Sequence, residues 1–171
     1  MQNFLELCRN RRSIRTYINR AVEPDKLDRI LQCALMSPSG KRLNPWKFYV
    51  LTDEAMLRKL AGCRTYGSQM FQTAMAAVVV ALDASLTDTW QSDGAIAAHN
   101  ILLAAEDEGL GACWCQIYQR EGAEELVREV AGVEEGLTVL CVISLGYKNE
   151  ERKQYDLAKL AYDKVIKKDN T

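Results

Sequence analysis

The sequence predicts a single domain of the α/β or α+β class. Its 171 residues, with 48% hydrophobic and 26% charged side chains, are enough for one domain with a substantial core. Apolar runs of strand length occur at 47–51, 76–82, 112–118 and 138–145, and segments of helical character lie between them. No repeat, low-complexity tract or linker interrupts the chain, so we predict that residues 1–171 form one domain.

The first half of the chain contains three predicted helices. A short helix is expected over residues 3–9, and a second begins at Pro24, because proline suits the first turn of a helix. Apolar residues recur along the second helix at the spacing of one helical face: Leu27, Ile30, Leu31, Ala34 and Leu35. Asp53 opens the third helix, and the continuous apolar run at 76–82 predicts a strand that is buried on both faces.

The segment from Gly94 to Glu108 is apolar almost all round, and Asp93 is its predicted N-cap. Such a helix is buried on most sides, either in a core or against a partner chain. We expect His99, which lies on it, to be packed and hydrogen-bonded. A last helix is predicted over 121–131. The charged segment 147–171 has little core pattern, so it is either a frayed tail or an arm that wraps another surface.

Composition and charge exclude several classes of partner. A net charge of −1 gives no large field for nucleic acid or an acidic membrane surface, and the apolar runs are too short to span a bilayer. The N-terminus lacks the pattern of a signal peptide, and the six cysteines are scattered, so we expect a cytoplasmic protein with reduced thiols. The single histidine and the cysteine spacing do not form a metal site.

The first candidate binding segment is basic. It places four arginines within seven residues, at positions 9, 11, 12 and 15, with Ser13 among them. The guanidinium group is a rigid fork of donors that matches a phosphate, and a serine hydroxyl adds a small donor. Taken alone, these residues slightly favour the alternative, a solvated helix end.

The second candidate segment, residues 37–48, lies between a predicted helix and a predicted strand, where ligand-binding loops are common. Ser39 and the Gly40 amide are small donors. Lys41 and Arg42 add two cations, and an asparagine amide and a tryptophan ring follow. This set suits a flat ligand with polar edges and a phosphate. The alternative for this segment alone is a helix stop followed by a core tryptophan.

Together the two segments have a specific order. The chain reads Arg-Arg-Ser-x-Arg, then a helix, then Pro-Ser-Gly-x-x-x-x-Pro-Trp-x-Phe leading into a strand. In this order it resembles the nitroreductase family of FMN-dependent oxidoreductases, and the likeness continues through 93–114 and 145–147. The resemblance implies an α+β fold with a mostly antiparallel sheet flanked by helices. It also implies an intertwined homodimer in which a C-terminal arm, about 147–171, crosses onto the partner subunit.

The resemblance also implies which residues contact the cofactor, FMN. The residues implied on one subunit are Arg11, Arg12, Ser13 and Arg15. They would contact the phosphate, the ribityl chain and the ring edge, with Arg15 near N1 and O2. The residues implied on the other subunit are Pro38, Ser39 and Gly40.

Further positions follow from the same resemblance. Backbone near the flavin N5 is implied at Trp114, Cys115 and Gln116. Lys159 aligns with a basic residue of the family that binds the phosphate, although the family usually has arginine there. Lys41 and Arg42 are either active-site rim residues that meet the substrate or plain surface charges.

The implied reaction needs no catalytic protein side chain, because the flavin carries the chemistry. NADH or NADPH would reduce FMN, the nicotinamide would leave, and a small nitroaromatic or quinone would then enter, in a ping-pong cycle. Two alternatives stay open. Pro-Ser-Gly also occurs in flavin-dependent reductive dehalogenases, and a dimer could bind FMN without turnover. Residues 62–92 are short for the family, so we expect an open pocket or one capped by the partner's arm.

Overall fold

Strand β2 (Ala76–Leu82) is the centre of the fold in the computed structural model, which describes residues 3–168. All seven of its residues are buried. Alternate side chains enter two different cores, with Val79 on one face of the sheet and Val78 and Val80 on the other. The prediction of a strand buried on both faces is therefore confirmed.

The sheet has four strands in the order β1-β2-β4-β3, and every neighbouring pair is antiparallel. The other strands are β1 (Trp46–Leu51), β3 (Gly111–Gln116) and β4 (Thr138–Gly146). β1 and β3 are the edge strands. This arrangement confirms the α+β fold with an antiparallel sheet.

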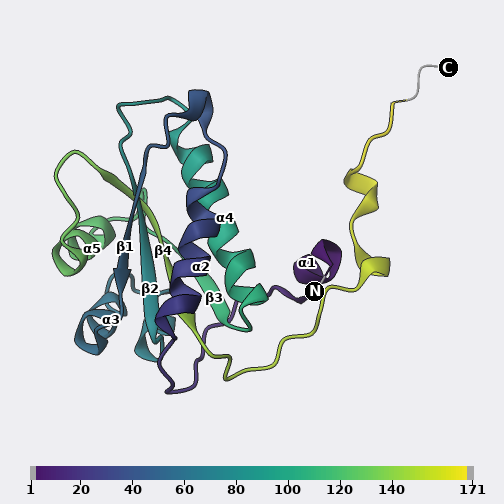
Figure 1. Ribbon diagram of the computed structural model, residues 1–171, viewed down its shortest axis with the longest axis horizontal. Coiled ribbons are helices and arrows are strands. Elements are labelled where there is room, and N and C mark those ends of the chain that lie inside the picture. The colour runs from purple at the N-terminus through teal and green to yellow at the C-terminus, as the bar shows by residue number, and fades with distance from the viewer. Residues whose placement is uncertain (1–2, 169–171) are drawn as a thin grey trace.

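Helices cover both faces of the sheet (Figure 1). α2 (Pro24–Leu35) and α4 (Trp90–Asp107) pack on one face, and α3 (Glu54–Leu60) and α5 (Ala123–Ala131) pack on the other. α1 (Phe4–Asn10) packs outside this sandwich, against α4. No helix among residues 3–168 is long and apolar enough to cross a lipid bilayer.

Helix α4 differs from its prediction in two respects. It begins at Trp90, with Thr89 as N-cap, so Asp93 is not the N-cap but lies in the first turn. There its carboxylate is buried and accepts one hydrogen bond from the distant Gly40 amide and one from the hydroxyl of the N-cap, Thr89. His99 is exposed in the single chain, so the expectation of a packed histidine was wrong. Ile96 is exposed too, which shows that part of the apolar surface of α4 is not covered by residues 3–168 of one chain.

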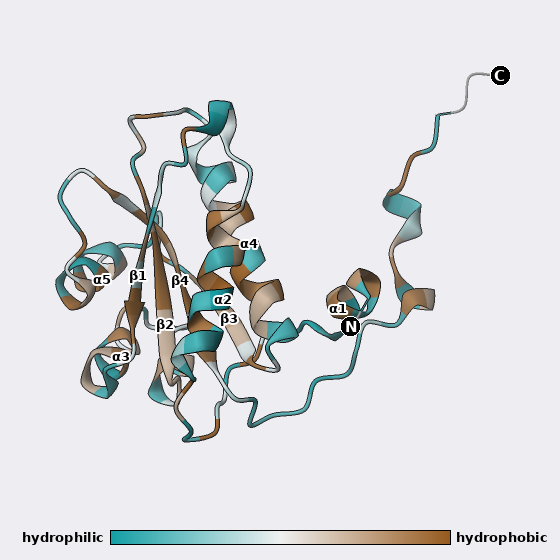
Figure 2. Cartoon of the chain, viewed as in Figure 1, coloured by the Kyte–Doolittle hydropathy of each residue, from teal (hydrophilic) through white to brown (hydrophobic). Residues whose placement is uncertain are grey.

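The C-terminal segment leaves the body of the molecule. Tyr147 and Lys148 still pack on it, through Glu23 and Glu106. Beyond Glu150 the chain runs past α1 and projects away from the sandwich, and residues 151–168 are exposed (Figure 1). Figure 2 shows that apolar residues are spaced along this exposed segment. An arm is therefore present, and its apolar side chains have no core in their own chain.

Candidate cofactor-binding site

The arginine segment lies along the outer edge of β3. Ser13 pairs with Ala112 in a parallel bridge, and the Ile14 amide donates to the Ala112 carbonyl at 3.0 Å. Ile14 and Tyr17 are buried, whereas Arg15 between them is exposed. The apolar side chains thus anchor the segment, and the basic ones project from it.

Two glycines in the sheet allow Ile14 and Tyr17 to pack close against its backbone. A Cβ at Gly111 would lie 2.7 Å from Ile14, and one at Gly146 would lie 2.9 Å from the Tyr17 ring. The Tyr17 hydroxyl donates to the Ile14 carbonyl at 2.6 Å and lies 2.7 Å from the Ser144 hydroxyl. Burial raises the pKa of Tyr17, so the phenol stays neutral and serves as a fixed donor.

A polar cavity of about 190 Å³ opens beside the segment, lined by Arg12, Ser13, Arg15, Arg152 and Tyr155. The Arg12 guanidinium stacks over the Tyr155 ring, 4.5 Å from its centroid, and donates to the Lys153 carbonyl. The structure thus brings three predicted residues together with two that the sequence analysis missed, Arg152 and Tyr155. Guanidinium groups and a hydroxyl around a small cavity fit a phosphate. Arg11 lies at the margin and donates to the Tyr155 hydroxyl at 3.3 Å.

Glu150 holds the backbone of the arginine segment in place. Its carboxylate accepts from the amides of Arg15 at 2.5 Å and Thr16 at 3.2 Å, and it pairs with Arg152 at 2.5 Å. Partial burial acts to raise the pKa of Glu150, but the Arg15 amide and Arg152 outweigh it and leave the pKa below its ordinary value. A carboxylate beside the cavity therefore stays ionised near neutral pH.

The Pro38–Gly40 segment forms a tight loop with the short 3-10 helix η1 (Gly40–Arg42). Lys41, Arg42 and Asn44 have φ angles of 52°, 58° and 46°, which non-glycine residues rarely adopt. Ser39 closes the loop, since its hydroxyl accepts from the Asn44 amide at 3.0 Å and donates to the Asn44 side chain at 2.8 Å. Lys41 and Arg42 are exposed at its tip.

The predicted N5 segment is the end of β3. Trp114 and Gln116 are half-buried and linked, with the indole donating to the Gln116 side chain at 3.0 Å. Cys115 is fully buried on the opposite face of the sheet, so only its backbone could meet a ligand. Arg64, which the sequence analysis missed, donates to the Gln116 carbonyl at 3.3 Å. In the sequence, the only signal for Arg64 is that it follows closely after α3.

One chain does not bring all predicted residues together. The Gly40 loop is bonded to Asp93 in the first turn of α4, whereas Ser13 pairs with β3 just beyond the last turn. The helix from Asp93 to Asp107 spans about 20 Å at about 1.5 Å per residue. Figure 1 shows the two segments at opposite ends of α4. Lys159 lies on the exposed arm, 3.7 Å from Asp156, and does not line the arginine cavity.

The fold corresponds to that of a family of oxidoreductases, solved members of which include FMN-dependent and FMN-bound proteins. The model of the nitroreductase family matches residues 8–76 and 63–147, so the chain belongs to the nitroreductase family. An Archaeoglobus fulgidus protein, provisionally named NADH dehydrogenase/NAD(P)H nitroreductase, is 38% identical over 160 residues, or 91% of each chain.

Solved structures agree with this assignment. An FMN-dependent nitroreductase from Clostridium difficile R20291 superposes with a TM-score of 0.93 at 39% identity, covering 98% of this chain and 100% of its own. A provisionally named nitroreductase from Desulfovibrio desulfuricans, in complex with FMN, has a TM-score of 0.79 at 26% identity, covering 98% of this chain and 100% of its own. The chain thus matches FMN proteins over nearly its whole length.

Proposed function

We propose that the protein is an FMN-dependent oxidoreductase that uses NADH or NADPH to reduce a small acceptor. The observation that carries this proposal is the arginine cavity beside β3, whose donors suit a phosphate and which lies on a fold shared with FMN-binding relatives. When bound, FMN would supply the hydride chemistry between the nucleotide and the acceptor, in a ping-pong order.

The chain's own residues would bind and orient the cofactor. Arg12 and Ser13, with Arg152 from the arm, suit the phosphate end, because all three line one cavity. Arg15 would place a cation where negative charge develops on the reduced ring. The backbone at Cys115 and Gln116 would run along the ring, since no strand among residues 3–168 pairs with the outer edge of β3 at that point.

We further propose that the site is completed by a second copy of the chain. The Gly40 loop and the arginine segment are about 20 Å apart within one chain, a separation set by α4. The Pro38–Gly40 loop of one subunit would therefore serve the cofactor held by the arginines of the other.

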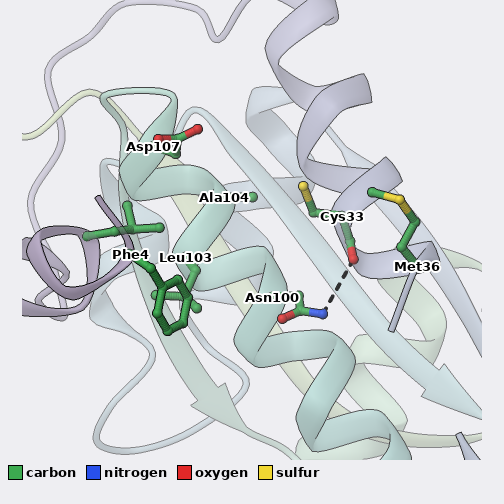
Figure 3. Close-up of a pocket in the computed structure, with 8 residues that line it drawn as sticks. Phe4, Cys33, Met36, Asn100, Leu103, Ala104 and Asp107 are labelled. Carbon is green, nitrogen blue, oxygen red and sulfur yellow. Dashed lines mark hydrogen bonds between the residues drawn. The ribbon is translucent and has the colours of Figure 1, made fainter. Parts of the chain in front are cut away.

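An apolar groove supports this pairing (Figure 3). It has a volume of about 470 Å³ and is lined by Phe4, Leu7, Cys33, Met36, Asn100, Leu103, Ala104 and Asp107. Phe4 is 70% exposed and Met36 75% exposed, and exposed Ile96 extends the apolar surface along α4. A contiguous apolar surface of this kind is typical of a protein interface. The arm, from about residue 147, would add to it by crossing onto the partner.

The acceptor would enter beside the Gly40 loop, where Lys41 and Arg42 are exposed. We propose that these two cations form the rim of the active site and that the acceptor is of the nitroaromatic or quinone type. Their left-handed backbone supports a functional role, because such strain is retained mainly at ligand sites.

The decisive test uses the purified protein. It should bind about one FMN per chain, and anaerobic NADH or NADPH should bleach the flavin absorbance in a stopped-flow measurement. A protein that cannot be reconstituted with FMN would contradict the proposal. A protein that holds FMN without being reduced at a useful rate would instead be a flavin-binding dimer without turnover.

A further inference from the structure

Asp93 is a buried carboxylate whose position in α4 is not explained by packing. It is only 4% exposed, and its neighbours on the buried side of the helix are the small residues Gly94, Ala97 and Ala98. Burying a carboxylate carries a free-energy cost unless both oxygens find donors. The two donors that it finds therefore indicate what the residue does.

One oxygen of Asp93 holds the Gly40 loop, and the other accepts from Thr89, the N-cap of α4. Oδ1 accepts from the Gly40 amide at 3.0 Å, and Oδ2 accepts from the Thr89 hydroxyl at 3.2 Å. The Thr87 hydroxyl lies 2.9 Å from that of Thr89 and extends the chain of hydrogen bonds. A hydrogen bond to an ionised acceptor is about twice as strong as one between neutral groups. The loop is thus tied to the first turn of α4 by a charged anchor.

The loop needs such an anchor. Lys41, Arg42 and Asn44 all have left-handed backbone angles, which would relax if nothing opposed them. The loop also sits closely on the anchor, since a Cβ at Gly40 would lie 2.5 Å from Thr89 Oγ1. The remaining bonds of Ser39 and Asn44 lie within the loop and do not attach it to the body.

We infer that Asp93 is a positioning residue for the cofactor, which presents the Pro38–Gly40 loop to the FMN held by the arginines of the partner subunit. This inference rests on the proposed function. Asp93 would not touch the cofactor. It would fix the backbone that does, and it would act on the site of the other subunit.

The first measurement compares FMN affinity after the flavin has been stripped from the full-length protein. Asp93→Ala should raise the Kd for FMN by about tenfold or more, because one charge-assisted bond is lost and the loop is released. Asp93→Asn should stay within about threefold of the wild type, since its amide oxygen still accepts from the Gly40 amide. Equal affinity for Asp93→Ala and wild type would overturn the inference.

The second measurement tests action across the interface. A mixed dimer of an Asp93→Ala chain with an Arg11→Ala/Arg12→Ala chain contains one doubly damaged site and one intact site. It should bind one FMN with wild-type affinity, although neither variant homodimer binds tightly. A general folding defect could not be repaired in this way. A mixed dimer that binds no better than the two homodimers would refute the assignment.

Gly40→Ala gives a second route if Asp93→Ala does not fold. Its Cβ would lie 2.5 Å from the Thr89 hydroxyl oxygen, so the loop or the Thr89 side chain must shift and the bonds that join them to Asp93 are disturbed. The variant should show the same loss and the same recovery in a mixed dimer. Failure of either would count against the inference. Wild-type protein that does not bind FMN would overturn the proposed function and this inference with it, whereas normal wild-type binding without recovery overturns only the inference.

Discussion

At the scale of single residues, the position of the arginine segment depends on two glycines, because a side chain at either one would block a close contact. Gly111 permits Ile14 to lie against β3, and Gly146 does the same for Tyr17. Glu150 then fixes the backbone amides of Arg15 and Thr16. The orientation of the basic side chains is therefore set by neighbours that carry no affinity for a cofactor themselves.

Gly111→Ala should destabilise the fold by about 1–3 kcal/mol, because the added Cβ would lie 2.7 Å from a buried branched side chain. Urea unfolding measures this loss. Gly62→Ala is the matched control, since its Cβ would meet only the Lys59 carbonyl, at 3.4 Å. Equal free energies of unfolding for the two variants would show that the segment does not pack as described.

Glu150→Gln should make stability less dependent on pH in the acid range. The folded-state pKa of Glu150 is lowered, so its contribution is present above the unfolded pKa of about 4.3 and is lost as pH falls through the folded pKa. The difference in unfolding free energy between wild type and variant should be largest near pH 7 and shrink below about pH 4. A difference that stays constant over this range would contradict the role of the ionised carboxylate.

Arg15→Ala should lower the reduction potential of the bound FMN, because a cation beside the reduced ring favours its anionic form. Arg15→Lys keeps the charge and should retain most of the potential. Spectroelectrochemical titration of the three proteins measures the midpoints. An unchanged midpoint in Arg15→Ala would place Arg15 away from the ring.

At the scale of elements, the C-terminal end of α4 carries acidic residues. The helix dipole disfavours negative charge there, and partners on other segments compensate for it. Glu106 pairs with Lys148 at 2.7 Å, and Glu108 takes a two-pronged contact from Arg29 at 2.6 and 2.8 Å. Lys26 also donates to the Glu108 carbonyl at 2.5 Å. The acids thus connect α4 to α2 and to the start of the arm.

Glu108→Gln should cost about 0.5–1 kcal/mol, because it removes a charged contact between two helices at a partly exposed site. The loss should shrink at high salt, where screening weakens the pair in the wild type as well. Glu54→Gln is the control, since the Glu54 side chain is largely exposed and its pair with Arg58 is longer, at 3.3 Å. Thermal unfolding at low and high salt compares them, and an equal loss in both variants would argue against the connecting role.

Most elements could be predicted from the sequence because their apolar patterns are local. The strand at 76–82 and the helix from Pro24 needed no tertiary information. The start of α4 did, since its first turn is polar and is held by Thr89 and by contacts of Asp93 with a distant loop. Leu35 was expected on the apolar face of α2 but is exposed, in a separate hollow that it shares with Trp46 and Phe48, because no residue among 3–168 covers it.

At the scale of the whole molecule, the candidate site was predictable only where the chain carries a local motif. Arg12, Ser13 and Arg15 do meet in one cavity. After β4 the chain returns past α1, and this return brings Arg152, Tyr155 and Glu150 to the same site. No local sequence pattern predicts such a return. The role of Lys159 stays a prediction, because it depends on where the arm goes in a dimer.

The central claim is that each cofactor site is shared between two chains. Met36→Glu/Leu103→Glu places two charges in the apolar groove and should yield monomers, whereas Tyr66→Glu, at an exposed position outside the residues that line the groove, should leave the dimer intact. Analytical ultracentrifugation followed at both the protein and the flavin absorbance measures mass and FMN content together. We predict that wild type and Tyr66→Glu sediment as dimers with two FMN, and that the monomeric variant carries none. Folded monomers with one tightly bound FMN each would contradict the claim.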